Sequence, residues 1–428
     1  MLAWPARQAR LAGQNGAWSK SAQCHTEERV PTPPAKGQAP ARAASPVMHT
    51  AVPPSHRQPL PDALRALALL AVLAVNATGY AAAPWGTLLG EPLPAASWAA
   101  RAWQGLLAAL LQGKGWPMLA FLFGMSLALA MRRAGPADAL AARLQAIRRQ
   151  KRLLALGVLH GVLLYFGDIL TLYAVLGWLL LRSQPTRPEP WRLFRPRLRR
   201  AAMWALAAVL LGGALAWWFD ARWGSFAHSS EPRLVHASYY LEFIAINADA
   251  YALGQVSVLL LGWQVARLCL LCGMASVRLR LLTHPRWHPA LRSWVKAAAL
   301  PLLGSAVVYG LAVAQLPPGQ LLPTWADTLG QLSGPPTAAL AVAALALASG
   351  GGRARWCAWI APLGRCTLSV YIGHSALCML LFTPLGLGLV PSTLQMAGFW
   401  LGLWLLALAA AHATGSRRWP LEVWLARR

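Results

Sequence analysis

A histidine and an aspartate lie eight residues apart in a stretch that is otherwise almost uncharged. His160 and Asp168 belong to residues 151–174, which open with Lys151 and Arg152 and then run apolar. Hydrocarbon offers ionisable groups no hydration, so such groups are costly there and point to a role beyond helix stability. A neutral imidazole is a suitable general base towards a hydroxyl or an amine, and Asp168 would orient the imidazole or bind an acceptor.

A second histidine, His374, lies at a similar depth in another apolar stretch. His160 and His374 each follow the start of their predicted helix by about 11 residues, which corresponds to roughly 16 Å along a helix axis. Tyr371 precedes His374 by one turn, and Ser375 follows it. The two histidines would share one polar cavity with Asp168, or each would hydrogen-bond a neighbouring helix. Candidate substrate-binding phenols are Tyr165, Tyr173 and Tyr371.

Basic side chains near helix ends are candidate ligands for an anionic substrate. Asp62 and Arg65 are three residues apart and share a helix face. Either they form an ion pair that anchors the helix end, or Arg65 binds a phosphate or carboxylate. Arg365 is interpreted first as one of the basic residues expected on the cytoplasmic side, and second as a residue that binds a ligand. Lys114, between two glycines, either snorkels towards the interface or contacts a substrate.

The composition excludes an ordinary soluble domain. Of the 428 residues, 57% are hydrophobic and 12% are charged, and the formal net charge is +26. A basic chain either binds nucleic acid or carries basic cytoplasmic loops, and the long uncharged runs here favour a membrane protein over a nucleic-acid partner. The sequence contains no phosphate-binding loop, nucleophile elbow or metal-ligand cluster, so no metal is predicted and an ATP-driven pump is disfavoured. Cys269 and Cys272 are interpreted as packing residues.

The apolar runs predict an all-α integral membrane protein with about ten transmembrane helices. The predicted spans are residues 62–80, 116–131, 149–166, 169–181, 200–219, 252–274, 295–314, 336–350, 363–382 and 394–413. Residues 101–112 are predicted to form an interfacial helix, and residues 418–424 an amphipathic tail. Residues 1–55 have the composition of a disordered extension, and translation is expected to begin near Met48. The polytopic membrane domain is therefore assigned to residues 60–428.

The distribution of basic residues predicts the orientation of these spans. With the N-terminus inside, the supposed cytoplasmic loops hold 26 Lys and Arg residues, and the supposed outer loops hold only Arg222 and Arg233. Cytoplasmic loops of membrane proteins carry the excess of Lys and Arg. Both termini are therefore predicted to be cytoplasmic, and residues 220–250 form the longest predicted outer loop.

Five segments resemble the YeiB-like family of bacterial membrane proteins. They are residues 62–70, 116–124, 156–174, 363–371 and 419–424, in the family's order. The string Gly-Asp-Ile-Leu-Thr-Leu-Tyr-Ala at 167–174, preceded by Gly157 and His160, is quite specific. Ala66 stands where the family has Gly, and Val370 stands where it has Asn. Residues 416–419 lack the Gly that precedes the family's closing Pro, which weakens the transfer of any role to the tail.

The resemblance implies a multipass protein of the bacterial inner membrane whose C-terminal half, from about residue 250, is a domain of unknown function. The family is in turn similar to transmembrane acyltransferases, including the lysosomal heparan-glucosaminide acetyltransferase type. Those enzymes are thought to carry an acyl group from a cytoplasmic acyl-CoA to an acceptor across the membrane, with a membrane-embedded histidine.

We therefore hypothesise an acyltransferase-like membrane enzyme with acyl-CoA as the donor. Arg65 and Arg365 would hold the donor, His160 and His374 would supply base or acyl-relay chemistry, and Asp168 would orient the acceptor. An alternative is a small-solute transporter lined by the same polar residues, although no inverted repeat is visible. A third is a scaffold without chemistry of its own. The expected partners are the lipid bilayer and a small-molecule substrate, and the oligomeric state is left open.

Overall fold

The computed structural model describes residues 59–81, 97–133, 138–183, 190–223, 240–258, 262–316, 322–349, 355–383, 385–415 and 419–427. The predicted extension 1–55, with Met48, lies outside these residues. All described secondary structure is helical. The helices are α1 (Leu60–Ala81), α2 (Trp98–Leu110), α3 (Gly115–Arg133), α4 (Ala139–Leu163), α5 (Leu170–Ser183), α6 (Trp191–Trp223), α7 (Tyr240–Ser257), α8 (Trp263–Leu279), η4 (Pro285–Trp287), α9 (His288–Ala314), α10 (Thr324–Ala348), α11 (Arg355–Gly364), α12 (Thr367–Phe382), α13 (Thr393–Ala413) and α14 (Pro420–Ala426).

Six helical segments of the described chain are long and apolar enough to cross a bilayer. They are α1, α2 with α3, α6, α9, α10 and α13, and α11 with α12 makes a seventh if this pair, bent by 60°, is one span. The prediction of an all-α multipass membrane protein is confirmed. By length and hydropathy the described helices supply six or seven candidate spans, against about ten predicted for the whole chain, and the predicted orientation of both termini stays a prediction.

Several predicted spans begin elsewhere. The predicted span 252–274 covers the end of α7 at Ser257 and the start of α8 at Trp263, and residues 259–261 between them lie outside the described residues. α7 begins at Tyr240, inside the predicted outer loop 220–250. α4 and α10 begin 10 and 12 residues before the predicted starts at 149 and 336, because basic residues and prolines there do not end the helix.

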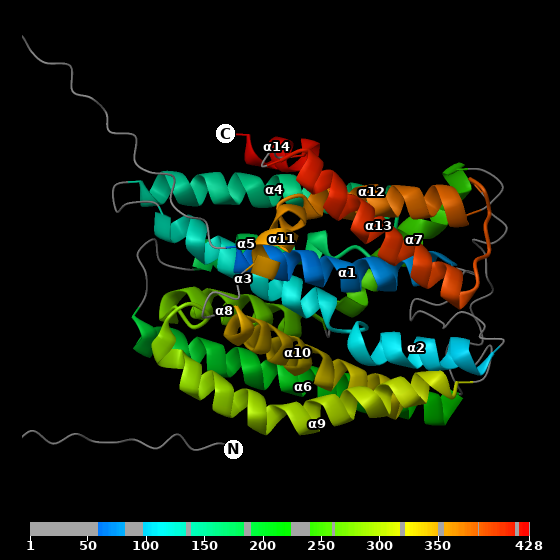
Figure 1. Cartoon of the computed structure of the whole chain (residues 1–428), viewed down its shortest axis with the longest axis horizontal. Coiled ribbons are helices and arrows are strands. Elements are labelled where there is room, and N and C mark those ends of the chain that lie inside the picture. Colours follow the sequence, from blue (N-terminus) through cyan, green and yellow to red (C-terminus); the bar gives the residue numbers. More distant parts are fainter. Residues whose placement is uncertain are drawn as a thin grey trace, which may run out of the picture. The chain divides into compact units, whose positions relative to one another are not determined.

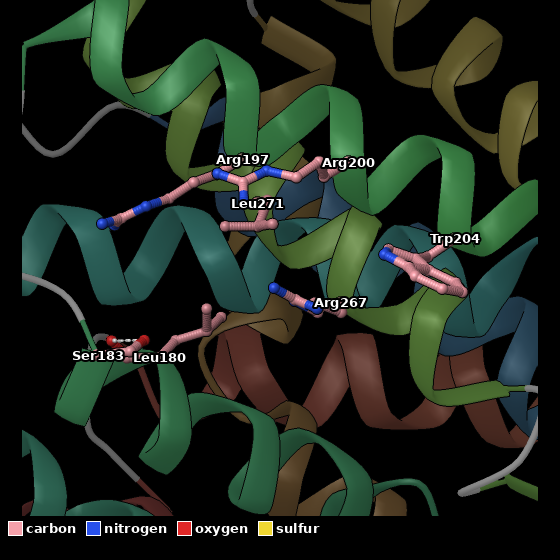
Figure 2. A pocket seen from close by; sticks show the side chains of 7 residues that line it. All are labelled: Leu180, Ser183, Arg197, Arg200, Trp204, Arg267 and Leu271. Atoms are coloured by element: carbon pink, nitrogen blue, oxygen red, sulfur yellow. Dashed lines mark hydrogen bonds between the residues drawn. The ribbon is translucent and has the colours of Figure 1, made fainter.

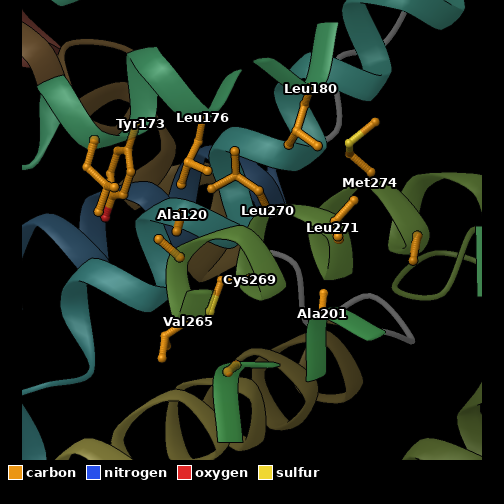
Figure 3. Close-up of a cluster of buried hydrophobic side chains, with 14 of the residues drawn as sticks. Ala120, Tyr173, Leu176, Leu180, Ala201, Val265, Cys269, Leu270, Leu271 and Met274 are labelled. Carbon is orange, nitrogen blue, oxygen red and sulfur yellow. The ribbon is translucent and has the colours of Figure 1, made fainter. Parts of the chain in front are cut away.

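The helices pack around a centre formed by α1, α3 and α8. In Figure 1, α6, α9 and α10 lie on one side of α1 and α3, and α4, α12 and α13 lie on the other. The largest cluster of buried apolar side chains joins α3, α5, α6 and α8 and includes Leu176 and Leu270 (Figure 3). A further cluster joins α1 to α11, α12 and α13. The first cluster fixes α5, and the second fixes α12.

The outer helices carry apolar side chains on their exposed faces. In the most apolar 18-residue stretch of each helix, 17% of α6 and 22% of α9 is buried inside the protein, whereas 72% of α1 is buried. Leu206 and Leu210 of α6 and Leu303 and Leu311 of α9 are among the exposed apolar side chains. A continuous apolar surface of this kind is unfavourable in water. It indicates that these helices lie in a lipid bilayer.

Candidate catalytic site

His160 connects Asp168 and Ser375 inside the helical bundle. The His160 Nδ1 atom lies 3.0 Å from Asp168 Oδ1, and the His160 Nε2 atom lies 2.9 Å from Ser375 Oγ. All three residues are buried, with 2%, 5% and 0% of their surfaces exposed. The three side chains come from the last turn of α4, the connection to α5, and the middle of α12. The site therefore depends on how α12 packs against α4.

The connection between α4 and α5 holds Asp168 in place. The Asp168 Oδ2 atom accepts the backbone N–H of Thr171 in the first turn of α5, at 2.7 Å. A carboxylate is favourable there, because the start of a helix carries a partial positive charge. The Thr171 hydroxyl lies 2.9 Å from the Tyr251 hydroxyl of α7. Asp168 is thus tied to α5 through one oxygen and to His160 through the other.

Gly157 allows this connection to approach α4 closely. It lies three residues before His160, on the same side of the helix. A Cβ atom at this position would lie 2.6 Å from the Thr171 nitrogen and hydroxyl, and 2.9 Å from Asp168 Oδ2. A side chain at residue 157 would therefore push the Asp168 turn away from His160.

Asn247 of α7 holds the other end of the same turn. Its Nδ2 atom donates to the carbonyls of Gly161 and Val162 at 2.6 and 2.8 Å, and its Oδ1 atom accepts the Phe166 N–H at 3.0 Å. The last carbonyls of a helix have no partner within the helix, so α7 supplies the partner that the end of α4 needs. α7 therefore supports the site from outside.

Tyr371 and His374 lie beside this site in different ways. The Tyr371 ring lies 4.7 Å from the His160 ring, centroid to centroid, so the phenol packs against one side of the imidazole. The Tyr371 side chain is itself buried, with 3% of its surface exposed. His374 turns instead to the Cys378 Sγ atom, 3.4 Å from its Nε2, and to the Phe399 ring. The described contacts thus link His160 to Ser375 rather than to His374.

The predicted donor-binding arginines form a separate group around Asp62. Arg65 donates to Asp62 and to the Ser126 hydroxyl, and the Arg365 Nε atom lies 3.7 Å from Asp62 Oδ2. The ion pair between Asp62 and Arg65 is present. Two guanidinium groups share one carboxylate, which leaves this cluster with a net positive charge.

The remaining predicted residues, Lys114, Tyr165 and Tyr173, make structural contacts in the described part of the chain. The Lys114 Nζ atom donates to the Ala108 carbonyl at 2.9 Å and lies 5.3 Å from the centre of the Tyr309 ring. The Tyr165 ring stacks on the Tyr80 ring at 4.6 Å. The Tyr173 hydroxyl donates to the Trp116 carbonyl at 2.5 Å. Their binding role stays a prediction.

The sequence reasoning assigned no role to Ser375. His374 and Ser375 lie three and four residues after Tyr371, so both share a helix face with Tyr371. Helical periodicity therefore does not decide which of the two meets His160, and the packing of α12 against α4 does. Asn247 and Thr171 carried no signal in the sequence either.

Asp168, His160 and Ser375 are linked in the order carboxylate, imidazole, hydroxyl, which is the arrangement that activates a nucleophile. Asp168 accepts the Nδ1–H of His160, which leaves Nε2 as the acceptor of the Ser375 hydroxyl. A hydroxyl bonded to a base, and a base oriented by a third group, is the geometric signature of nucleophilic catalysis on unrelated folds. Among the described residues, no three His, Cys, Asp or Glu side chains gather closely enough to hold a metal ion.

Comparison with known proteins finds one family match, which covers the C-terminal part of the chain. Residues 276–427 match the family described as "Protein of unknown function (DUF418)". No curated protein matches the chain. Ser375 and Tyr371 lie inside the matched segment, and His160 and Asp168 lie before it, so the site joins the two parts. The chain is a multipass helical membrane protein that carries a DUF418 domain.

Proposed function

We propose that this protein is a membrane acyltransferase and that Ser375 is its nucleophile. The observation that carries the proposal is the buried chain of contacts from Asp168 through His160 to Ser375, at 3.0 and 2.9 Å. A serine hydroxyl is a weak nucleophile unless an adjacent base removes its proton. His160 is placed to do this, and Asp168 stabilises the imidazolium that forms.

The reaction has two balanced steps. In the first, Ser375 Oγ attacks the thioester carbonyl of an acyl donor, His160 Nε2 takes the hydroxyl proton, and the departing thiolate receives that proton. In the second, an acceptor hydroxyl or amine loses its proton to His160 and attacks the serine ester, and the proton returns to Ser375 Oγ. The roles of His160 as base and acid alternate, as microscopic reversibility requires.

The donor that fits the proposal is an acyl-CoA on the cytoplasmic side of the inner membrane. The net positive cluster of Arg65, Arg365 and Asp62 supports this, because guanidinium groups pair with phosphates. The side chains of Arg65 and Arg365 are 20% and 32% exposed, so both are partly accessible. Ser375 is fully buried, so the acyl group reaches it only when α12 and its neighbours move apart.

The proposal is tested by acyl labelling of the protein itself. Inside-out membrane vesicles that contain the full chain are given acetyl-CoA, and longer acyl-CoA donors, labelled in the acyl group, without an added acceptor. We expect the label to be bound covalently to Ser375 and to disappear in Ser375→Ala and His160→Gln. Ser333→Ala serves as the matched control, because the Ser333 hydroxyl is also buried in a helix but makes no hydrogen bond within the described residues.

Two results would reject acyl transfer through Ser375. One is an equal amount of label in wild type and in Ser375→Ala. The other is no label with any donor, although size-exclusion chromatography shows folded protein. In the second case, uptake of small solutes into the same vesicles tests the transporter alternative.

A further inference from the structure

A cavity of about 330 Å³ lies between α5, α6 and α8, apart from the residues described above. Its lining residues are Leu180 and Ser183 of α5, Arg197, Arg200 and Trp204 of α6, and Arg267 and Leu271 of α8 (Figure 2). Arg197, Arg200 and Trp204 follow one another at spacings of three and four, so they occupy one face of α6. Arg267 and Leu271 occupy a face of α8 in the same way.

The cavity is cationic and has apolar walls. Three of its seven lining residues are arginines and none is acidic. Leu180 and Leu271 are 7% and 2% exposed, so they belong to the protein interior. Trp204 lies at one end of the group of lining residues in Figure 2 and adds a flat apolar ring to the cavity. A guanidinium group held between such walls interacts more strongly with an anion than it would in water.

Arg267 is the most unusual of these residues. It lies in the second turn of α8, roughly 18 Å from the end of the helix at Leu279, and it is partly buried. Within the described part of the chain, its guanidinium has neither a hydrogen-bond partner nor an ion-pair partner. A partly buried cation without a partner among apolar helices is a candidate ligand-binding residue.

We propose that this cavity binds a phosphate group. The planar guanidinium presents paired N–H donors that match two oxygens of a phosphate, and several arginines around one concavity are the usual form of such a site. The phosphate belongs either to a soluble ligand such as coenzyme A or to the headgroup of an anionic lipid, because both carry the same group. This proposal does not depend on acyl transfer, because none of the residues that line the cavity belongs to the candidate catalytic site.

Binding is measured with the full chain purified in dodecyl maltoside, a detergent without phosphate. One arm measures equilibrium binding of radiolabelled coenzyme A, and the other uses native mass spectrometry with added phosphatidylglycerol. Arg267→Gln and Arg200→Gln are compared with Arg199→Gln, which removes an exposed arginine of α6 that does not line the cavity. We expect at least one probe to bind, with affinity about tenfold weaker in Arg267→Gln and weaker in Arg200→Gln, and unchanged in Arg199→Gln.

The two arms identify the source of the phosphate. Retention of coenzyme A indicates a soluble ligand, and a phosphatidylglycerol adduct indicates a lipid headgroup. The proposal is overturned if wild type binds neither probe, or if Arg199→Gln weakens binding as much as Arg267→Gln, because general charge attraction then explains the result. Arg200 is exposed, so Arg200→Gln tests the site even if Arg267→Gln fails to fold.

Discussion

Glu422 of α14 caps the first turn of α12 together with Ser369. The Glu422 Oε1 atom accepts the backbone N–H groups of Leu368 and Ser369 at 2.9 and 3.0 Å, and its Oε2 atom accepts the Ser369 hydroxyl. The residue at the N-cap position of α12, Cys366, makes no side-chain cap hydrogen bond. The C-terminal tail, whose sequence predicts an amphipathic segment at the interface, therefore supplies the cap of the helix that carries Ser375.

Replacing Glu422 with Ala is expected to lower the free energy of unfolding by about 2 kcal/mol. The change removes charge-assisted hydrogen bonds and leaves two backbone donors of α12 without a partner. Thermal unfolding in detergent measures the loss. Asp138→Ala is the control, because Asp138 also precedes a helix but makes no side-chain cap hydrogen bond. An equal loss in both variants would contradict the capping role.

Gly124 of α3 is expected to tolerate no side chain. A Cβ atom at this position would overlap the backbone of Leu270 in α8. Because backbone atoms cannot rotate away, Gly124→Ala should cost about 1–3 kcal/mol of stability. Gly402→Ala in α13 is the matched control: a Cβ there has no heavy atom within 4 Å, and alanine favours a helix. Thermal unfolding should separate the two variants, and similar midpoints would reject close packing of α3 on α8.

The sequence predicts the helices better than their ends. An apolar run of about 20 residues indicates a membrane helix whatever surrounds it, so α1, α3 and α13 could be located closely. The start of α7 at Tyr240 could not, because it lies inside the predicted outer loop 220–250. Asn247 of α7 donates to carbonyls of α4 that are more than 80 residues away in sequence, and hydropathy does not encode such a contact. Pro335 and Pro336 stay inside α10, which begins 12 residues before the predicted start at 336.

The sequence likewise predicts one part of the candidate site and misses another. His160 and Asp168 are eight residues apart, so a helix followed by a short turn can bring them together, and the structure places them 3.0 Å apart. Ser375 lies 215 residues from His160. Its position depends on how α12 packs, which hydropathy does not encode. Arg267 was also missed, because it falls inside the apolar run assigned to one span.

Asn247 should control the order of the turn that carries Asp168. In Asn247→Ala, the carbonyls of Gly161 and Val162 and the Phe166 N–H lose their partner, which costs about 1–3 kcal/mol. The loss is local, so hydrogen exchange of residues 161–170 should become roughly tenfold faster or more while α13 is unchanged. Hydrogen-exchange mass spectrometry measures this. Gln255→Ala, on the same helix, should leave the exchange unaffected; faster exchange in both variants would indicate general loosening of α7.

Asp168, His160 and Ser375 should act as one unit if the proposed acyl transfer is correct. Removing the base or the nucleophile stops the same proton transfer, so Ser375→Ala and His160→Gln should each lower the rate at which the acyl-CoA donor is cleaved by about 100-fold or more. The rate of the double variant should lie within about threefold of that of the slower single variant, because a group without its partner contributes little. Asp168→Asn keeps the size of the side chain but no longer fixes which imidazole nitrogen carries the proton, so it should also slow donor cleavage strongly. Release of free coenzyme A by folded protein in vesicles gives the rates of wild type and of the four variants. Effects that multiply in the double variant would show that His160 and Ser375 act independently, and the contact between them would then be structural.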